Sequence, residues 1–371
     1  MNSKSPNLIA ETLTKEIRSG KYASSSRPFP SERALARRFG VSRVTITSAL
    51  RELRGMGLLV ALHGKGTFLT RSARKMCGKI GLILPGVAYS EFFQPVLAEL
   101  SRLCQSKGIG LMFGGAFSPD GDLRAKQALD LAKDMVNERV SGVILQPIES
   151  LPNAPRINGR IASIFKEAGI PMVLLDSDIV PPPERSAYDV VGINNFDAGR
   201  RLAVHLLAAG ARRIVFATMP HPCYSIRNRL AGVYSVLSAH GEKLQAVWAL
   251  SSTDVPAIRK AFRRDRPDAI ICCCDTFAAY LKNSLEKAGR KFADEVMLAG
   301  FDDLQHASLI TPKLTTIRQP CAEIAAQAFK ALEERIAAPD APPREILLHA
   351  PLVVRASTRD AASRKNMKRR K

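Results

Sequence analysis

The sequence predicts an α/β protein: a small N-terminal domain of helices and a β-hairpin, followed by a larger two-lobed body built on parallel sheets. Three observations support this prediction. The first 70 residues combine a helical spacing of apolar residues with helix-capping and turn residues. From residue 79 on, short apolar runs alternate with amphipathic segments, as in parallel strands joined by helices. The positive charge is concentrated at the two ends of the chain, which separates them from a nearly neutral middle.

Three short helices are predicted in the N-terminal domain. Ile9, Leu13 and Ile17 recur every four residues and form the apolar stripe of the first helix. Two serines, Ser31 and Ser42, stand directly before the next two helical segments, where a side-chain oxygen caps a helix N-terminus. The spacing therefore predicts three helices joined by short turns.

The third helix has two unlike faces, and a β-hairpin follows it. Ile46 and Leu50 lie on the face predicted to be buried. The opposite face carries basic and hydroxyl side chains, namely Arg43, Thr45, Thr47, Arg51 and Arg54. Residues 58–62 and 67–69 are predicted to be two strands joined by a glycine-flanked turn at 63–66.

The body is predicted to consist of parallel strands covered by helices. Eight apolar runs are the expected strands, at residues 80–84, 109–113, 142–145, 171–175, 190–193, 213–217, 269–274 and 296–301. Amphipathic segments between them include 93–107, 123–138, 198–209 and 277–288. Because residues 79–358 are too many for one sheet, we expect two α/β lobes with a cleft between them.

The net charge of +21 is unevenly distributed. Residues 1–75 hold 15 basic and 4 acidic side chains, and residues 359–371 hold 7 and 1. The long middle holds 33 and 29. A positive terminal domain on a nearly neutral body indicates a polyanion-binding head joined to a part with another task. Residues 359–371 lack apolar content and are expected to form a basic disordered tail.

Several classes of protein are disfavoured by composition. No run of about 18 apolar residues occurs, so no membrane span is expected. The first residues lack the apolar core of a secretory signal. The seven cysteines form no C-x-x-C pair, and three of them, at 272–274, lie inside an apolar run. We therefore expect reduced thiols, no metal site, no cofactor and a cytoplasmic location.

The N-terminal domain contains ordered motifs that match a known domain. They read Pro30-Ser31-Glu32-Arg33-Ala34-Leu35-Ala36, Phe39-Gly40-Val41-Ser42-Arg43-Val44-Thr45-Ile46, Ala49-Leu50-Arg51-Glu52-Leu53, Gly57-Leu58-Leu59 and His63-Gly64-Lys65-Gly66-Thr67-Phe68. In order and spacing they resemble the winged helix-turn-helix of the GntR family, over residues 6–70. The resemblance implies a DNA-reading helix that begins after Ser42.

The same resemblance implies a set of positions that contact DNA. They are Arg33, Ser42, Arg43, Thr45, Thr47, His63, Gly64 and Lys65. An arginine fork matches two acceptors on guanine, and hydroxyls and helix N-termini hold phosphates. Thr47 departs from the family, many of whose members carry arginine there, so the operator sequence stays open. The alternatives are that each arginine is a solvated helix residue and that His63 is a plain turn residue.

Three segments of the body also match a known domain. They are Gly192-Ile193-Asn194-Asn195-Phe196-Asp197-Ala198-Gly199-Arg200, Arg227-Asn228-Arg229-Leu230-Ala231-Gly232, and Gly300-Phe301-Asp302-Asp303 followed by Leu314-Thr315-Thr316-Ile317-Arg318-Gln319-Pro320. They resemble the LacI-type ligand-binding domain, itself similar to periplasmic sugar-binding proteins, over residues 79–358. The hinge helix of LacI proteins is not recognisable, so the combination resembles the mixed GntR and LacI architecture of arabinose-type regulators.

A ligand pocket is expected at the carboxyl ends of the strands, where open α/β folds bind their ligands. The resemblance places there Phe92, Phe93, Gln146, Asp176, Arg227, Arg229, Cys274, Asp275 and Asp302. Carboxylates suit sugar hydroxyls, arginine suits a ring oxygen or carboxylate, and phenyl rings stack on a sugar or a base. Cys274 stands where the family often has asparagine. The alternatives are that the phenylalanines belong to the core and that Asp176 and Asp302 cap helices.

Together these features predict a sequence-specific, DNA-binding transcription regulator whose operator affinity a small ligand controls. Repression is the commoner output, with activation as the alternative. A sugar is the expected effector because of the clustered carboxylates, with a purine-type or other effector as the alternative. An enzyme on this scaffold is disfavoured, because no phosphate loop, nucleophile elbow or zinc motif appears.

The expected partners are a palindromic double-stranded operator, the small effector and a second copy of the chain, without a membrane. The predicted domains are a winged helix-turn-helix at 1–70, a linker at 71–78, the ligand-binding domain at 79–358 and the tail at 359–371.

Overall fold

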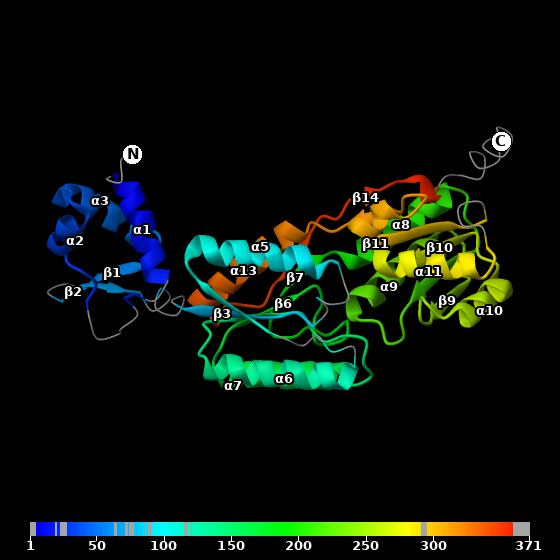
Figure 1. Ribbon diagram of the computed structural model, residues 1–371, viewed down its shortest axis with the longest axis horizontal. Helices are drawn as coiled ribbons and strands as arrows, with labels where there is room; N and C mark the ends of the chain where they lie inside the picture. Colours follow the sequence, from blue (N-terminus) through cyan, green and yellow to red (C-terminus); the bar gives the residue numbers. More distant parts are fainter. Residues whose placement is uncertain are drawn as a thin grey trace.

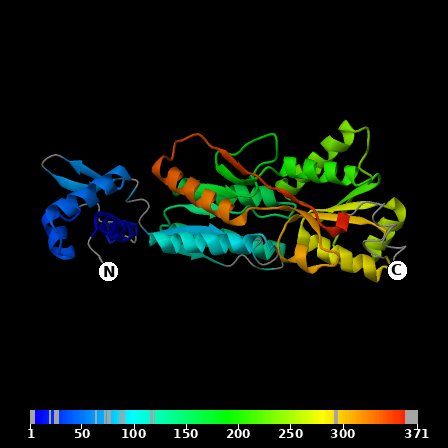
Figure 2. The same cartoon turned by 90° about the horizontal axis from the view of Figure 1, so that it is seen from above.

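The computed structural model describes residues 5–18, 21–22, 28–62, 65–70, 73, 78–85, 87, 91–114, 118, 120–290 and 295–358. These residues form three bodies in a row, an N-terminal domain, a first lobe and a second lobe (Figures 1 and 2). The predicted tail and most of the predicted linker lie outside the described residues. Within the described part, no helix has the length and apolar character needed to cross a membrane.

The N-terminal domain is a bundle of three helices with a hairpin. Its elements are α1 (Pro6–Arg18), α2 (Glu32–Phe39), α3 (Arg43–Gly55), β1 (Leu59–Leu62) and β2 (Gly66–Leu69), and the two strands are antiparallel. The predicted caps are confirmed: Ser31 Oγ accepts from the Ala34 amide and Ser42 Oγ from the Thr45 amide, each at 3.3 Å. Gly40 ends α2 at a φ of +64°, a left-handed conformation that glycine adopts without strain.

The first lobe is a parallel sheet with helices on both faces. Its strands are β3 (Lys79–Ile83), β4 (Gly110–Phe113), β5 (Val143–Leu145), β6 (Met172–Leu175), β7 (Asp189–Ile193) and β13 (Glu345–Leu348), in the order β13-β7-β6-β5-β3-β4. Its helices are α5 (Phe93–Lys107), α6 (Gly121–Asn137), α7 (Ala154–Glu167) and α13 (Cys321–Ala337). Helices α5 and α13 cover one face and α6 and α7 the other (Figure 1).

The second lobe repeats this plan. Its strands are β8 (Ile214–Thr218), β9 (Ala246–Ala249), β10 (Ala269–Cys272), β11 (Met297–Asp302), β12 (Thr315–Arg318) and β14 (Leu352–Val353), in the order β14-β12-β11-β10-β8-β9. Only the β12–β14 pair is antiparallel. Its helices are α8 (Asn195–Ala208), α9 (Tyr224–Ala239), α10 (Val255–Asp265), α11 (Asp275–Lys287), α12 (Gln305–Leu309) and the 3-10 turn η1 (Ala356–Thr358).

The chain crosses between the lobes three times, after β7, after β12 and between β13 and β14. Near the first crossing, α8 and α9 touch backbone to backbone. A Cβ on Gly199 would lie 2.0 Å from the Arg229 carbonyl oxygen, and one on Gly232 would lie 2.0 Å from the Phe196 carbonyl oxygen. These two glycines therefore allow α9 to bring Arg229 close to the crossing.

The predicted fold class, a winged helix-turn-helix followed by a two-lobed parallel α/β body, is confirmed. The eight predicted strands correspond to β3–β8, β10 and β11. Strands β9, β12, β13 and β14 were not among them. Three of these four, β9, β13 and β14, are edge strands, and β12 lies beside an edge, where burial and thus the apolar signal are weaker.

Candidate ligand cavity and nucleic-acid interface

A cavity of about 530 Å³ lies between the lobes, at the carboxyl ends of strands from both sheets. Seven residues predicted to bind ligand line it: Phe92, Phe93, Gln146, Asp176, Arg229, Cys274 and Asp302. Residues that the sequence reasoning did not single out line it too, among them Arg124, Glu149, His221, Cys223 and Gln319. Its volume is in the range typical of small-molecule sites.

Arg229 is the buried cation of this cavity. Its side chain is 4% exposed and lies 4.0 Å from Asp302. Its Nε donates to Asn195 Oδ1 at 2.8 Å and its Nη1 to the Cys273 carbonyl at 2.7 Å. The guanidinium also lies 4.5 Å from the centre of the Phe301 ring. These contacts fix the orientation of Arg229 before any ligand binds.

Asp302 ends β11 and is held by a residue of the second crossing. Gln319 Nε2 donates to Asp302 Oδ1 at 2.7 Å, and the Gln319 amide donates to the Asp302 carbonyl at 3.2 Å. Burial raises the pKa of Asp302 to about 6, although Arg229 and Gln319 act in the opposite direction. The contacts with Arg229 and Gln319 therefore compensate only part of the negative charge that Asp302 presents to the cavity.

Two predicted ligand residues do not line the cavity. Asp275 accepts from Thr316 Oγ1 at 2.8 and 3.0 Å and from the Asp303 amide at 2.7 Å, so its oxygens hold β11 and β12 instead. Burial raises its pKa well above the usual value. Arg227 donates to the Pro222 carbonyl at 3.1 Å and lines a smaller adjoining cavity of about 220 Å³.

Phe92 and Phe93 serve the core and the cavity wall at once. They are 3% and 4% exposed and pack edge to face, with ring centres 4.8 Å apart. The two rings therefore belong to the core, and they also line the cavity in which a ligand would bind. Cys274 Sγ accepts from the Phe277 amide at 3.5 Å and so caps α11.

Glu149 and Gln319 are the main lining residues that the sequence reasoning missed. Glu149 lies four residues beyond the end of β5. Gln319 directly follows β12 and belongs to a crossing. A polar residue just after an expected strand was the available signal, but β12 was not predicted and the course of the chain after β5 was not foreseen. In the described part, no group of three or more histidine, cysteine or acidic residues is arranged to hold a metal ion.

The N-terminal end of α3 is exposed and, with neighbouring residues of the head, carries basic side chains. The Arg43 side chain is 73% exposed and 3.6 Å from Glu32, and Arg33 and Lys65 are exposed as well. Ser42 Oγ and Thr45 Oγ1 are hydrogen-bonded at 2.9 Å, and Thr47 Oγ1 donates to the Arg43 carbonyl at 2.9 Å. His63 and Gly64 lie outside the described residues.

Val44 is a further exposed residue of this helix that was not singled out. Its side chain is 79% exposed, although valine is apolar. It stands between Arg43 and Thr45, on the part of α3 that the resemblance directs to DNA. The sequence signal was an apolar residue outside the buried set of Ile46, Ala49, Leu50 and Leu53.

Comparison with known proteins gives two matching family models. Residues 7–69 match the bacterial regulatory proteins of the gntR family. Residues 203–358 match the periplasmic binding protein-like domain.

Two curated relatives align along most of their length. The arabinose metabolism transcriptional repressor of Geobacillus stearothermophilus is 26% identical over 365 residues, covering 94% of this chain and 97% of the relative. The HTH-type transcriptional repressor PurR of Mannheimia succiniciproducens is 23% identical over 345 residues, covering 88% and 98%.

Solved structures share the fold. The cellobiose complex of the transcriptional regulator CelR superposes with a TM-score of 0.64 at 20% identity, covering 89% of this chain and 100% of that one. A LacI family regulator from Enterococcus faecium with bound ribose gives a TM-score of 0.62 at 21% identity, covering 76% and 98%.

Proposed function

We propose that this chain, which joins a gntR-family winged helix-turn-helix to a LacI-type, periplasmic-binding-protein-like domain, is a transcription repressor controlled by a small ligand bound between its lobes. The observation that carries the proposal is the pairing of two separate features. One is the exposed basic end of α3 in the head, and the other is an interlobe cavity whose buried Arg229 and Asp302 bind residues of the lobe crossings.

We propose a sugar as the effector. The cavity presents acceptor oxygens of Glu149, Asp176 and Asp302, which suit a ligand with many hydroxyl donors. The relatives include an arabinose metabolism repressor and the repressor PurR, and a purine remains the alternative effector that the test must exclude. Because Phe92 and Phe93 are nearly covered by the core and by each other, little ring face is left for stacking on a base.

We further propose that residues 1–70 read DNA and residues 79–358 sense the ligand, joined by a linker at 71–78. Two copies of the chain would place two heads on the half-sites of a palindromic operator in the cytoplasm. Ligand-driven movement of the lobes would change the spacing of the heads and thus the operator affinity. Since the relatives are regulators, we propose no catalytic activity.

The test begins with selection of duplexes from a random DNA library by the full-length protein. Fluorescence anisotropy then measures affinity for the selected sequence at several salt concentrations. We expect the logarithm of the affinity to fall linearly with the logarithm of the salt concentration. Arg43→Ala should weaken binding by about 5- to 150-fold and relax the sequence preference, since a guanine-reading fork is worth about 1–3 kcal/mol.

Arg259→Ala is the matched control, because Arg259 is an exposed arginine on α10, far from the head (Figure 1). It removes the same charge and should leave affinity and preference unchanged. Failure of the protein to bind any duplex at low salt, with or without ligand, would contradict the proposal.

A further inference from the structure

The charges that line the interlobe cavity do not balance. Among the described residues, three carboxylates line it, those of Glu149, Asp176 and Asp302. Two guanidiniums accompany them, those of Arg229 and Arg124. His221 is exposed at the rim. With every carboxylate ionised, the cavity would hold one negative charge in excess, in surroundings where burial makes an uncompensated charge costly.

The buried polar atoms that lack a partner in this cavity are all acceptors. Glu149 Oε1, Asp176 Oδ1 and Gln319 Oε1 have no hydrogen-bond partner and are buried from solvent. Gln319 is also buried as a whole residue, with 5% of its surface exposed. Buried oxygens of this kind are normally paired, which indicates that a ligand supplies the missing donors.

The cations of the cavity already have partners. Arg229 uses Nε and Nη1 on Asn195 and Cys273 and lies beside Asp302. Arg124 donates Nη1 to the Ser118 carbonyl at 2.9 Å. The cavity therefore offers a ligand mainly unpaired acceptor oxygens, and one negative charge in excess when Glu149 is ionised. An ammonium group matches such a site best, because it brings three donors, one positive charge and no acceptor.

We propose that the effector is a polyhydroxylated amine, such as an amino sugar, whose protonated amino group binds among Glu149, Asp176 and Asp302. This inference rests on the proposed function and narrows its ligand class. The hydroxyl groups of such a ligand remain available to Gln146 and Gln319, which also line the cavity. Phosphorylated or acidic sugars would add negative charge and should bind more weakly.

The protonation of Glu149 predicts whether the affinity for the ligand rises or falls with pH, which can be measured. Burial raises the pKa of Glu149 to about 8, and the nearby charge of Asp176 raises it as well, while Cys223, Gln146 and Arg229 act against this. Burial therefore favours the protonated form of this carboxyl group in the empty cavity. A cationic ligand favours loss of that proton, so its affinity rises as the pH approaches 8. A neutral ligand that accepts the proton of Glu149 in a hydrogen bond shows the opposite trend.

The experiment uses the full-length protein, isothermal titration calorimetry and matched ligand pairs. Each pair differs only in its amino group: glucosamine and glucose, galactosamine and galactose, mannosamine and mannose, and glucamine and sorbitol. We expect an amine to bind about tenfold or more tightly than its neutral partner, and glucosamine 6-phosphate to bind more weakly than glucosamine. Glucamine, whose aliphatic amine keeps its proton as a lysine does, serves for the pH series from 6.5 to 8.5.

Two variants test whether the amino group of the ligand binds at Glu149. Glu149→Gln keeps the shape of the side chain and should remove both the preference for the amine and the rise of affinity with pH. Glu167→Gln makes the same change at an exposed position at the end of α7 and should alter neither. Unfolding curves of both variants show whether they are folded.

The outcomes distinguish a failure of the amine inference from a failure of the proposed function. Equal binding of an amine and its neutral partner, or an affinity that falls between pH 6.5 and 8.5, overturns the inference and leaves the proposed function standing. If no compound of either kind binds while the protein still binds DNA, both the inference and the proposed effector site are overturned.

Discussion

Arg229 connects the cavity to the places where the chain crosses between the lobes. It donates to Asn195, which begins α8 directly after the first crossing. It also lies beside Asp302, which accepts from Gln319 in the second crossing. A ligand that contacts Arg229 or Asp302 therefore acts on the hydrogen bonds that fix two crossings. Differential contacts of this kind are what allow a ligand to shift a conformational equilibrium.

The substitution Asp302→Asn removes the negative charge of this side chain but keeps its shape, so it tests the contribution of the charge alone. The amide oxygen can still accept from Gln319, but the negative charge is lost. We expect the affinity for a cavity ligand to fall about tenfold or more, since a hydrogen bond to a charged group contributes about 1.5–3 kcal/mol. Calorimetric titration of wild type and Asp302→Asn measures this. Unchanged affinity in the folded variant would remove Asp302 from the ligand contacts.

The same substitution should change the pH dependence of stability. Because the folded-state pKa of Asp302 is raised to about 6, folding favours its neutral form. Its contribution to the free energy of unfolding is thus fully present below about pH 4 and is lost as the pH rises through 6. Urea unfolding at pH 4, 5, 6 and 7 should show a smaller decline for Asp302→Asn than for wild type. A parallel decline in both proteins would contradict the assignment.

Val44 should contribute to DNA recognition without contributing to the fold. Its side chain is 79% exposed, so Val44→Ser should change the free energy of unfolding by less than about 0.5 kcal/mol. An apolar side chain at the start of a DNA-reading helix suits the methyl group of thymine. We expect severalfold weaker binding to the selected operator, measured by anisotropy. Val204→Ser, on the exposed side of α8, is the control that should bind normally.

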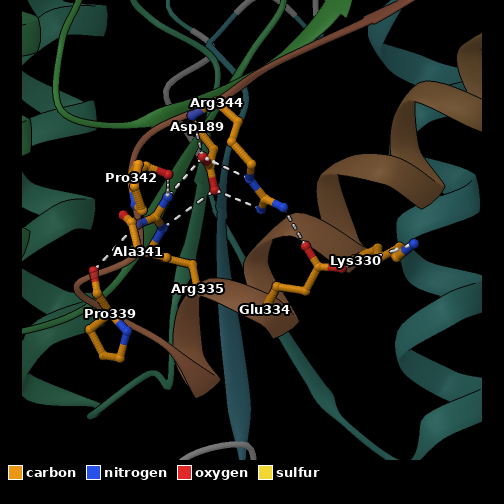
Figure 3. Close-up of polar contacts among 8 residues, drawn as sticks. All are labelled: Asp189, Lys330, Glu334, Arg335, Pro339, Ala341, Pro342 and Arg344. Carbon is orange, nitrogen blue, oxygen red and sulfur yellow. Dashed lines mark hydrogen bonds and ion pairs between the residues drawn. The ribbon is translucent and has the colours of Figure 1, made fainter.

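At the scale of elements, one buried carboxylate holds three segments of the first lobe together (Figure 3). Asp189 begins β7 and is fully buried. It accepts from Arg335 Nη2 of α13 at 2.8 Å, and from the amide and Nη2 of Arg344 at 2.7 and 3.1 Å. Arg335 also donates to the carbonyls of Pro339 and Pro342, which closes the connection from α13 to β13.

Removing this carboxylate should destabilise the protein strongly. Asp189→Ala leaves Arg335 buried without its charged partner, which costs about 3–5 kcal/mol. Arg344→Gln should cost much less, because Arg344 is partly exposed and Arg335 remains paired. The hydrogen bonds from Arg344 and Arg335 outweigh burial and lower the pKa of Asp189. Its stabilisation is therefore present above the ordinary aspartate pKa near 4 and is lost on acidification. Urea unfolding at pH 7 and pH 3 measures both effects.

The sequence predicts those elements whose burial is regular. The eight predicted strands are dense in apolar residues because helices cover both faces of their sheets. Strand β13 alternates exposed and half-buried residues at a sheet edge and pairs with β7, more than 150 residues earlier. Strand β14 has only two residues. No local pattern indicates such pairing, because the partner strand supplies the hydrogen bonds that define it.

In the candidate site, too, the local sequence pattern predicts some features, whereas tertiary packing determines the others. Asp275 follows β10 by three residues and Asp302 ends β11, and their sequence context gives no reason to treat them differently. Packing decides between them, because Thr316 on β12 and the Asp303 amide take up the oxygens of Asp275. Gln319 enters the cavity through a crossing between lobes. Such contacts depend on tertiary arrangement, so the sequence indicates the edge of the sheet but not every side chain that lines it.

At the scale of the whole molecule, a polar contact joins the two lobes directly. Glu91 precedes α5 in the first lobe, and His306 lies on α12 in the second. The His306 amide donates to Glu91 Oε2 at 3.2 Å, and its Nδ1 lies 2.7 Å from Glu91 Oε1. Glu91 also directly precedes Phe92 and Phe93, which line the cavity. The contact therefore stabilises the arrangement of lobes in which the cavity is enclosed from both sides.

Breaking this contact should favour a more open arrangement of the lobes. A hydrogen bond to a charged group contributes about 1.5–3 kcal/mol, which shifts a two-state equilibrium roughly 10- to 150-fold. Glu91→Ala removes the acceptor of the His306 amide and should therefore populate the open form. We expect a larger radius of gyration by small-angle X-ray scattering without ligand, and severalfold faster ligand dissociation. Glu333→Gln breaks the 2.5 Å pair of Lys107 and Glu333 inside the first lobe. It should change stability alone, so an equal change in lobe spacing for both variants would show that the Glu91–His306 contact does not control closure.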